Sequence, residues 1–504
     1  MVPRSESLTR RGLAPLGLIL LFVLTRIGAA LAGVRFDLSG LTGRVDYFQL
    51  LDVHDLRHHL VQSLWNLQSQ PPLFNLWSGL LIRLPSGLIG PTMTVMSWAF
   101  GVALLLSCFY LCLALKIHRY GAIAITTIVI LDPANLLYAN WYFDTYPTAV
   151  LMTFSALAIA RYIGTRSRLW GASFFCSVTL VVLFNSSFQW FWVVLVAAPV
   201  VWFLRAMCRT VLLLAVLPML VVIGWYAKNA VLFGTYSTSS WLGMNVARIT
   251  TAITGPPTLP RLIASGRLTP LAAVQPFLPL RSYHGQYSPH AATGVAVLDA
   301  PVKHDGAPNF NNINYIAVSS QFLKNDLAFV RAEPLQYAHS LQYSTRLFFF
   351  PTDRYFFLWP NASHLTSYAD TYDFLVGWQM HPSNFAITIT PKGGTDVIAP
   401  RGSWGPQHWS QVSLLAVAAF GMLGFLGPIA IWLRRRDHAV AAALFFIWSS
   451  SAYIFLLTSL MELGENMRFR YALGPLPLVG AVAVVCALIP RLNAARGSDA
   501  LSAP

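Results

Sequence analysis

Aspartates that could act in general acid–base chemistry are concentrated in residues 43–77, directly after the first long apolar segment. The stretch reads GRVDYFQLLDVHDLRHHLVQSLWNLQSQPPLFNLW and contains Asp46, Asp52 and Asp55. The chain as a whole is poor in charge, since 56% of its 504 residues are hydrophobic and 11% are charged. A carboxylate beside a reacting hydroxyl can remove its proton, so these three residues are the candidates for a general base.

Two shorter stretches carry further candidates. NWYFDTYP (residues 140–147) places Asp144 among aromatics, and ELGENMRFRY (residues 462–471) combines two acidic residues with Arg468 and Arg470. The planar guanidinium of arginine binds phosphate through two parallel hydrogen bonds. Transfer of a sugar from a lipid phosphate needs a base for the incoming hydroxyl and cations for the leaving phosphate. The three stretches together supply both.

Each candidate also has a purely structural interpretation. Asp52 and Asp55 suit the solvated face of a helix. Arg468 and Arg470 suit side chains that reach from a helix end to lipid headgroups. Asp144 suits a turn within an aromatic belt. The occurrence of all five in outer segments of one membrane protein favours the chemical interpretation.

The histidines of the first stretch suggest a metal site only weakly. His54 and His58 have the i, i+4 spacing of two ligands on one helix face. The sequence contains no further ligand motif such as HExxH. We therefore assign no metal ligands from the sequence, and a divalent metal ion stays open as a cofactor.

Composition predicts an all-α polytopic membrane protein, because a span needs about 20 apolar residues and soluble domains carry about twice this share of charge. We expect about ten transmembrane helices. The ten candidate segments are 12–34, 91–115, 121–139, 145–163, 169–185, 188–204, 210–227, 410–433, 438–460 and 472–490.

Basic residues predict the orientation. With ten spans, the short connections that carry lysine and arginine all fall on one side, which places both termini in the cytoplasm. The net charge of +15 is then mainly a result of topology, and no basic–aromatic stripe indicates a nucleic-acid partner. Of the 19 acidic residues, only Glu6, Asp437 and Asp499 lie on the predicted cytoplasmic side. The sequence thus predicts a cell-membrane protein with its active site on the outer face.

The predicted organisation has three parts. They are an N-terminal transmembrane module (1–227) with a catalytic first outer loop (35–90), a large outer segment (228–409) and a C-terminal transmembrane module (410–504).

Within the first outer loop, residues 52–66 predict one amphipathic helix that lies at the membrane surface. Its apolar stripe consists of Val53, Leu56, Leu60 and Leu64. Residues 73–84 predict a second interfacial helix.

Several segments resemble the GT-C glycosyltransferases, most closely the bacterial relatives of protein O-mannosyltransferases and of the lipid A aminoarabinose transferase. The resemblance spans most of the chain in short pieces. These are the acidic first outer loop, SQPPLFNLW, NWYFDTYP, WYAKNAVLFGTYSTSSWLGMNVA and ENMRFRYALGPL. It implies an inverting membrane transferase whose donor is a sugar on a polyprenyl phosphate. The implied acceptor is a glycan, a lipid or a protein. Membrane lipids are the other implied partners.

The resemblance also implies roles for individual residues. An aspartate of the first outer loop, well upstream of the Pro-Pro-Leu, is the base in that family. Asp46 matches that distance best, but Tyr47 follows it where the family carries glutamate. Asp52 matches better as the residue that opens the amphipathic helix. We rank Asp52 first, Asp46 second and Asp55 third.

The resemblance identifies the residues that bind the donor phosphate less directly than it identifies the base. Many relatives carry a lysine before the Pro-Pro, and this chain has Gln70 there. The donor phosphate is therefore assigned to Arg468, Arg470 or Lys228. Further substrate contacts are assigned to three residues of the same outer segments, Asp144, Gln70 and Glu465.

Two other functions stay open at this stage. A transporter or a flippase for lipid-linked sugars would share the many spans. Such proteins place ionisable residues at the bilayer midplane and often show inverted repeats. Here Arg26 is the main midplane charge and no repeat is visible, which favours the enzyme. A ligase for pyrophosphate-linked oligosaccharides would share the architecture of the transferase.

Overall fold

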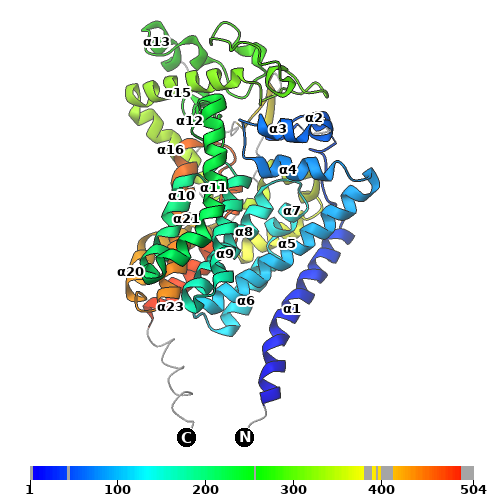
Figure 1. The fold of residues 1–504 in the computed structure, drawn as a ribbon, viewed down its shortest axis with the longest axis vertical. Coiled ribbons are helices and arrows are strands. Elements are labelled where there is room, and N and C mark those ends of the chain that lie inside the picture. Colours follow the sequence, from blue (N-terminus) through cyan, green and yellow to red (C-terminus); the bar gives the residue numbers. More distant parts are fainter. Residues whose placement is uncertain are drawn as a thin grey trace.

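In the computed structural model, the regular secondary structure of the described residues is helical apart from one two-stranded antiparallel hairpin (Figure 1). The described residues are 4–42, 46–254, 257–379, 389–392, 395–398 and 412–489. The predicted all-α class is confirmed for this part of the chain. The predicted boundary between residues 409 and 410 lies outside the described residues.

The apolar helices form a bundle around α8 (Thr145–Thr165). Of the residues in the apolar stretch of this helix, 72% are buried inside the protein. This helix packs against α5, α9 and α21. The helices of the bundle are α1 (Arg4–Leu31), α5 (Ser86–Ala114), α6 (Arg119–Leu131), α7 (Pro133–Ala139), α8 (Thr145–Thr165), α9 (Arg168–Phe184), α10 (Trp190–Phe203), α11 (Cys208–Phe233), α19 (Leu414–Gly421), α20 (Gly427–Leu433), α21 (His438–Met461), α22 (Asn466–Tyr471) and α23 (Leu476–Leu488). A π-turn at Met422–Leu426 continues α19 into α20.

Six helices of the described chain are long and apolar enough to cross a membrane, and a seventh span results if the bent pair α6–α7 counts as one. All ten predicted segments contain helix. However, α9, α10 and α23 are shorter apolar helices of 17, 14 and 13 residues. The chain is thus a membrane protein, and the count of ten spans stays a prediction.

Large apolar side chains cover the outside of the bundle. On α11 they recur at helical spacing, and Leu213, Leu217 and Leu220 are 73%, 70% and 57% exposed. Such a surface is unfavourable in water and matches the hydrocarbon of a bilayer.

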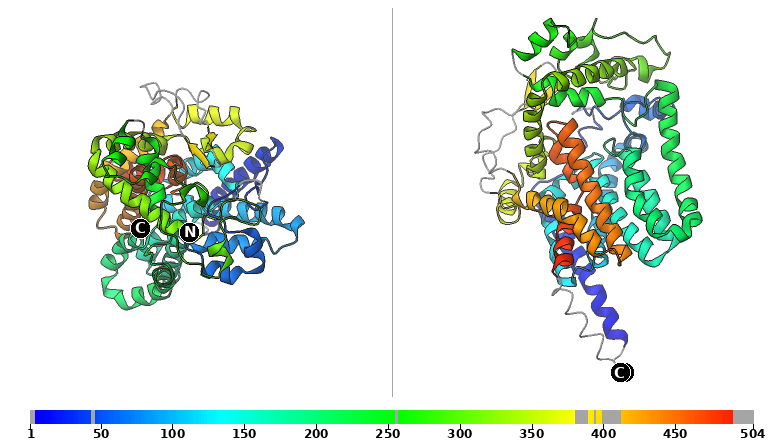
Figure 2. Two further views of the ribbon diagram at one scale, coloured as in Figure 1. Left: turned by 90° about the horizontal axis from the view of Figure 1, so that it is seen from above. Right: turned by 90° about the vertical axis from the view of Figure 1, so that its left-hand side faces the viewer.

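A polar layer covers one end of the bundle, at the top of Figure 1 and of the right-hand view in Figure 2. Its helices are α2 (Val53–His58), α3 (Leu60–Trp65), α4 (Pro72–Leu81), α12 (Leu242–Ile249), α13 (Thr258–Ala264), α14 (Ala296–Asp299), α15 (Asn314–Ala332) and the upper part of α16 (Pro334–Phe349). Two further helices, α17 (Trp359–Ala362) and α18 (Thr366–Leu375), and the hairpin β1 (Ile389–Lys392) with β2 (Thr395–Ile398) follow in the chain.

This layer has an apolar core of its own. Trp241, directly before α12, and Met244 of α12 pack with Tyr315 and Phe322 of α15, and Phe48 of the first outer loop packs against them. The two helices approach closely because Gly243 has no side chain, since a Cβ there would lie 1.8 Å from the carbonyl oxygen of Ser319. The first outer loop and the large outer segment therefore form one layer.

The predicted amphipathic helix 52–66 is divided in the structure. Helix α2 ends at His58, His59 adopts a non-helical backbone (φ −130°, ψ 39°), and α3 begins at Leu60. The break contains no glycine or proline. Because the helix is divided there, both α2 and α3 pack on α4. The predicted apolar stripe does face inward, and Leu56 is fully buried. The predicted second helix appears as α4, which begins at Pro72, a favourable first position.

The predicted orientation can be tested by cysteine labelling in intact cells. Ser265, after α13, and Arg435, after α20, are both exposed. In a background in which the exposed Cys176 and Cys208 are replaced by serine, an impermeant maleimide should label Ser265→Cys in intact cells. It should label Arg435→Cys only after permeabilisation. The reverse pattern would contradict the proposed sidedness.

Candidate functional site

A cavity of about 530 Å³ lies where the polar layer meets the ends of the bundle helices. Its wall includes the start of α8, the turn between α9 and α10, and the segment between α21 and α22. Five of the predicted site residues line it. These are Asp46, Gln70, Asp144, Glu465 and Arg468.

Asp46 is held at the cavity by its neighbour Tyr47. The Tyr47 side chain is 1% exposed, and its hydroxyl oxygen accepts a hydrogen bond of 2.7 Å from the indole Nε1 of Trp141. Two backbone bonds add to this link: the Asp37 N–H donates to Asn140, and the Tyr142 N–H donates to Asp37. The first outer loop and the NWYFDTYP turn are therefore bound together.

The carboxylate of Asp46 pairs with Lys303 of the outer segment. Lys303 Nζ lies 2.7 Å from Asp46 Oδ1 and also donates to the Tyr47 carbonyl at 3.3 Å. Burial raises the pKa of Asp46, and the charge and hydrogen bond of Lys303 oppose this rise. The role of Lys303 could not be predicted from the sequence, because this residue lies 257 residues from Asp46 in a segment without a motif.

Arg468 lies between two carboxylates at the cavity wall. Its Nη2 is 2.5 Å from Glu465 Oε2, and its Nη1 is 3.6 Å from Asp144 Oδ1. Its Nε is buried and has no hydrogen-bond partner among the described residues. Arg468 as a residue lines the cavity, and arginine is a side chain suited to binding an anion.

The turn before α22 positions Glu465 and Arg468. Gly464 has φ +114°, a backbone region that L side chains rarely adopt. The side-chain amide of the fully buried Asn466 donates to Ser344 Oγ and to two carbonyls, and its oxygen accepts from the Gly464 N–H. This buried amide joins the turn to α16 and α21.

Arg248 is a functional candidate that the sequence analysis missed. At the last turn of α12, its Nη1 lies 2.7 Å from Glu462 Oε1 and 3.8 Å from Glu465 Oε1. Burial alone would raise the pKa of Glu465, but Arg468 and Arg248 outweigh it and lower that pKa. The sequence feature that could have identified Arg248 is its position as an arginine at the end of a short amphipathic helix.

Asp144 and Gln70, which the sequence predicts as substrate contacts, both line the main cavity. Burial raises the pKa of Asp144 to about 6, against the opposing charge of Arg468. Gln70 follows a segment fixed by Asn311, whose Oδ1 accepts from the backbone N–H groups of Gln68 and Ser69.

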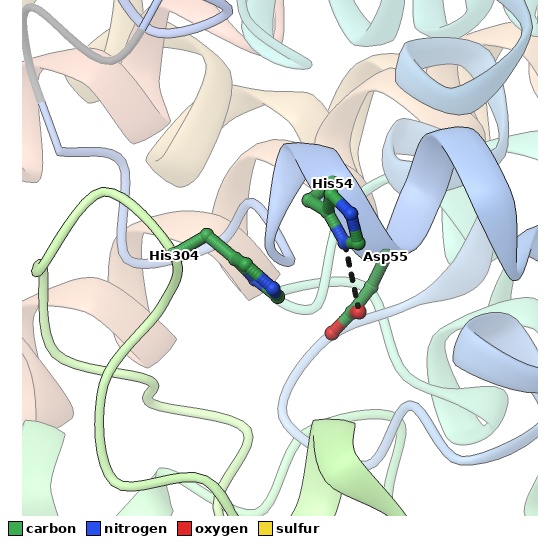
Figure 3. Close-up of side chains that lie close together, drawn as sticks. All are labelled: His54, Asp55 and His304. Atoms are coloured by element: carbon green, nitrogen blue, oxygen red, sulfur yellow. Dashed lines mark ion pairs between the residues drawn. The ribbon is translucent and has the colours of Figure 1, made fainter.

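Asp52 and Asp55 lie in other surroundings. Asp52 Oδ1 caps α2 by accepting from the His54 N–H, and its Oδ2 accepts from the N–H and the ring Nδ1 of His304, at 2.5 and 2.7 Å. These hydrogen bonds outweigh burial and lower the pKa of Asp52. Asp55 lies beside the His54 ring (Figure 3). Of the three predicted bases, Asp46 is the one that lines the main cavity, and the identity of the base stays a prediction.

Arg470 and Lys228 also do not line the main cavity. Arg470 is two positions from Arg468 on α22, so the two side chains leave the helix in nearly opposite directions. Its Nη2 donates to the Phe350 carbonyl at 2.6 Å, and it lines a second, smaller cavity with Asp353. Lys228 Nζ donates to the Leu67 carbonyl at 2.6 Å. Of the three predicted phosphate partners, Arg468 is the one at the main cavity.

Aromatic side chains make up much of the remaining wall of the main cavity. They are Tyr47, Phe48, Phe143, Trp241, Phe277, Tyr355, Phe356, Phe357 and Phe469. Ligand sites in proteins typically combine such an aromatic lining with a few polar groups.

The fold and the cavity together define a helical membrane protein with a polar, aromatic-lined site at one end of its apolar bundle. No protein-family model, no curated protein and no solved structure matches the chain.

The buried charges around Arg468 predict a pH-dependent cost of removing it. In Arg468→Met, Asp144 and Glu465 lose a partner, and breaking a buried pair costs about 3–5 kcal/mol. The folded-state pKa of Asp144 is already raised to about 6 and would rise further. The folded variant then binds protons that the unfolded chain releases, so its stability relative to wild type should fall between about pH 6 and 8.

Thermal unfolding in detergent at both pH values measures this effect. The matched control is Arg435→Met, because Arg435 is exposed and its guanidinium lies over Trp432. It should change stability by about 0.5 kcal/mol or less at either pH. An equal loss at both pH values in Arg468→Met would show that the carboxylates do not depend on this arginine.

Proposed function

We propose that this chain is an inverting glycosyltransferase that moves a sugar from a polyprenyl phosphate to an acceptor hydroxyl on the outer face of the cell membrane. The observation that carries this proposal is one cavity lined by both Asp46 and Arg468. A base for the acceptor and a cation for the leaving phosphate are the two groups that the reaction needs. The acceptor hydroxyl belongs to a glycan, a lipid or a protein.

The proposed reaction is a single displacement. The acceptor oxygen attacks the anomeric carbon and forms the new glycosidic bond, while the bond from that carbon to the phosphate oxygen breaks. The acceptor proton passes to the Asp46 carboxylate, and polyprenyl phosphate leaves with the bonding electrons. Lys303, 2.7 Å from Asp46, favours the ionised carboxylate that can accept this proton.

Arg468 is the proposed partner of the donor phosphate. It lines the cavity, and its guanidinium can bind a phosphate oxygen there. Arg248 extends the cationic wall toward the polar layer, since it also lines the cavity. We therefore propose that Arg468 and Arg248 together bind the donor phosphate. Arg248 takes the place of the predicted Arg470 and Lys228.

The position of the cavity suits a lipid-linked donor. The cavity lies at the ends of α8 and α21, where the apolar bundle meets the polar layer. A donor whose chain stays in the bilayer can present its sugar and phosphate at that level. A transporter would instead need such charges near the bilayer midplane.

Genetic complementation tests the assignment of Asp46. Deletion of the gene should remove one sugar from the envelope glycans or glycoproteins, as detected by mass spectrometry. Asp46→Asn keeps the shape of the side chain and removes its basicity, so it should lower the restored sugar transfer by about 100- to 10,000-fold. Wild-type levels of the sugar with Asp46→Asn would contradict the role of base.

The matched control is Glu333→Gln in the outer segment, which should restore the sugar because Glu333 pairs with the exposed Arg261 and does not line the cavity. Protein level and thermal unfolding of both variants distinguish lost chemistry from lost folding. Absence of any sugar difference after deletion would contradict the transferase itself.

A further inference from the structure

Three potential metal ligands from two distant segments meet outside the main cavity. His54 and Asp55 belong to α2, and His304 belongs to a turn in the outer segment (Figure 3). One ligand atom from each lies within 4.8 Å of the others. The sequence pattern instead paired His54 with His58, because His304 is 250 residues further along the chain.

The second contact of His304 prepares its ring for a metal. Its Nδ1 lies 2.7 Å from Asp52 Oδ2, and an ionised carboxylate can only accept a hydrogen bond. The proton therefore lies on Nδ1, and the lone pair of Nε2 is free. Metal-binding histidines commonly donate their other N–H to a carboxylate in this way, which fixes the ring and raises its basicity. Asp52 is thus a positioning residue of this cluster.

We propose that His54, Asp55 and His304 bind one Zn²⁺ ion, with water at the fourth position. Two imidazole nitrogens and one carboxylate oxygen are a ligand set that zinc favours. Ligand atoms of a tetrahedral zinc site are about 3.4 Å apart, given bond lengths of about 2.1 Å. The ligand atoms here lie within 4.8 Å of one another and must come closer by up to about 1.4 Å. The side chain of His54 is 49% exposed, so its ring can turn toward the other two ligands.

The ion would fasten the outer segment to the first outer loop. His304 follows Lys303, which pairs with Asp46, and the same turn lines the main cavity with Ala307 and Pro308. Zinc between α2 and this turn would therefore hold Lys303 in place beside Asp46. The binding site itself does not depend on the proposed transfer reaction.

Metal titration of the full-length protein in detergent tests the proposal directly. The protein, carrying an affinity tag without histidine and stripped by a chelator, is titrated with Co²⁺, whose visible absorption reports tetrahedral ligation. We expect one bound Co²⁺ per chain, displaced by Zn²⁺. His54→Ala and His304→Ala should abolish the signal, and Asp52→Asn should weaken affinity by about 10- to 100-fold.

His284→Ala is the matched control, because His284 is an exposed histidine of the same outer segment and should leave binding unchanged. Thermal unfolding of each variant without metal shows whether it is folded. The proposal is overturned if wild-type protein binds no Co²⁺, or if folded His54→Ala and His304→Ala bind it as wild type does.

Discussion

The ion pairs that join Arg468 and Arg248 to Glu465, Glu462 and Asp144 are the constraint on which the rest of the structure depends. They connect three parts of the chain: the start of α8, the turn into α22, and α12 of the polar layer. Because a buried charge without a partner is strongly destabilising, none of these parts can shift without loss of a pair. The charges thereby fix how the polar layer sits on the bundle.

The main cavity follows from this junction. Its inner wall consists of the ends of membrane helices, which carry Arg468 and Asp144, and its outer wall consists of the first outer loop and α12. Asp46 reaches the cavity because Tyr47 is bound to Trp141 on the bundle side. Asp46, the proposed base, and Arg468, the proposed phosphate partner, both line this cavity.

The sequence predicted local features well and distant partners poorly. Apolar length predicted the helices of the bundle, and aspartate and arginine near span ends predicted Asp46, Asp144 and Arg468 at the site. Asp52 was ranked first from its place at the helix start, and the local pattern could not show its partner His304, which lies 252 residues away. Lys303 and Arg248 carry no motif, and the pairs that make them important form only when the polar layer folds onto the bundle.

The most direct test of the account is a cryo-electron microscopy structure with a prenyl phosphonate analogue of the donor, in which the anomeric bond cannot break. The account predicts phosphonate density within about 3 Å of the Arg468 guanidinium, with the anomeric carbon facing the Asp46 carboxylate. Phosphonate bound in the second cavity beside Arg470, or bound away from both aspartate and arginine, would contradict it.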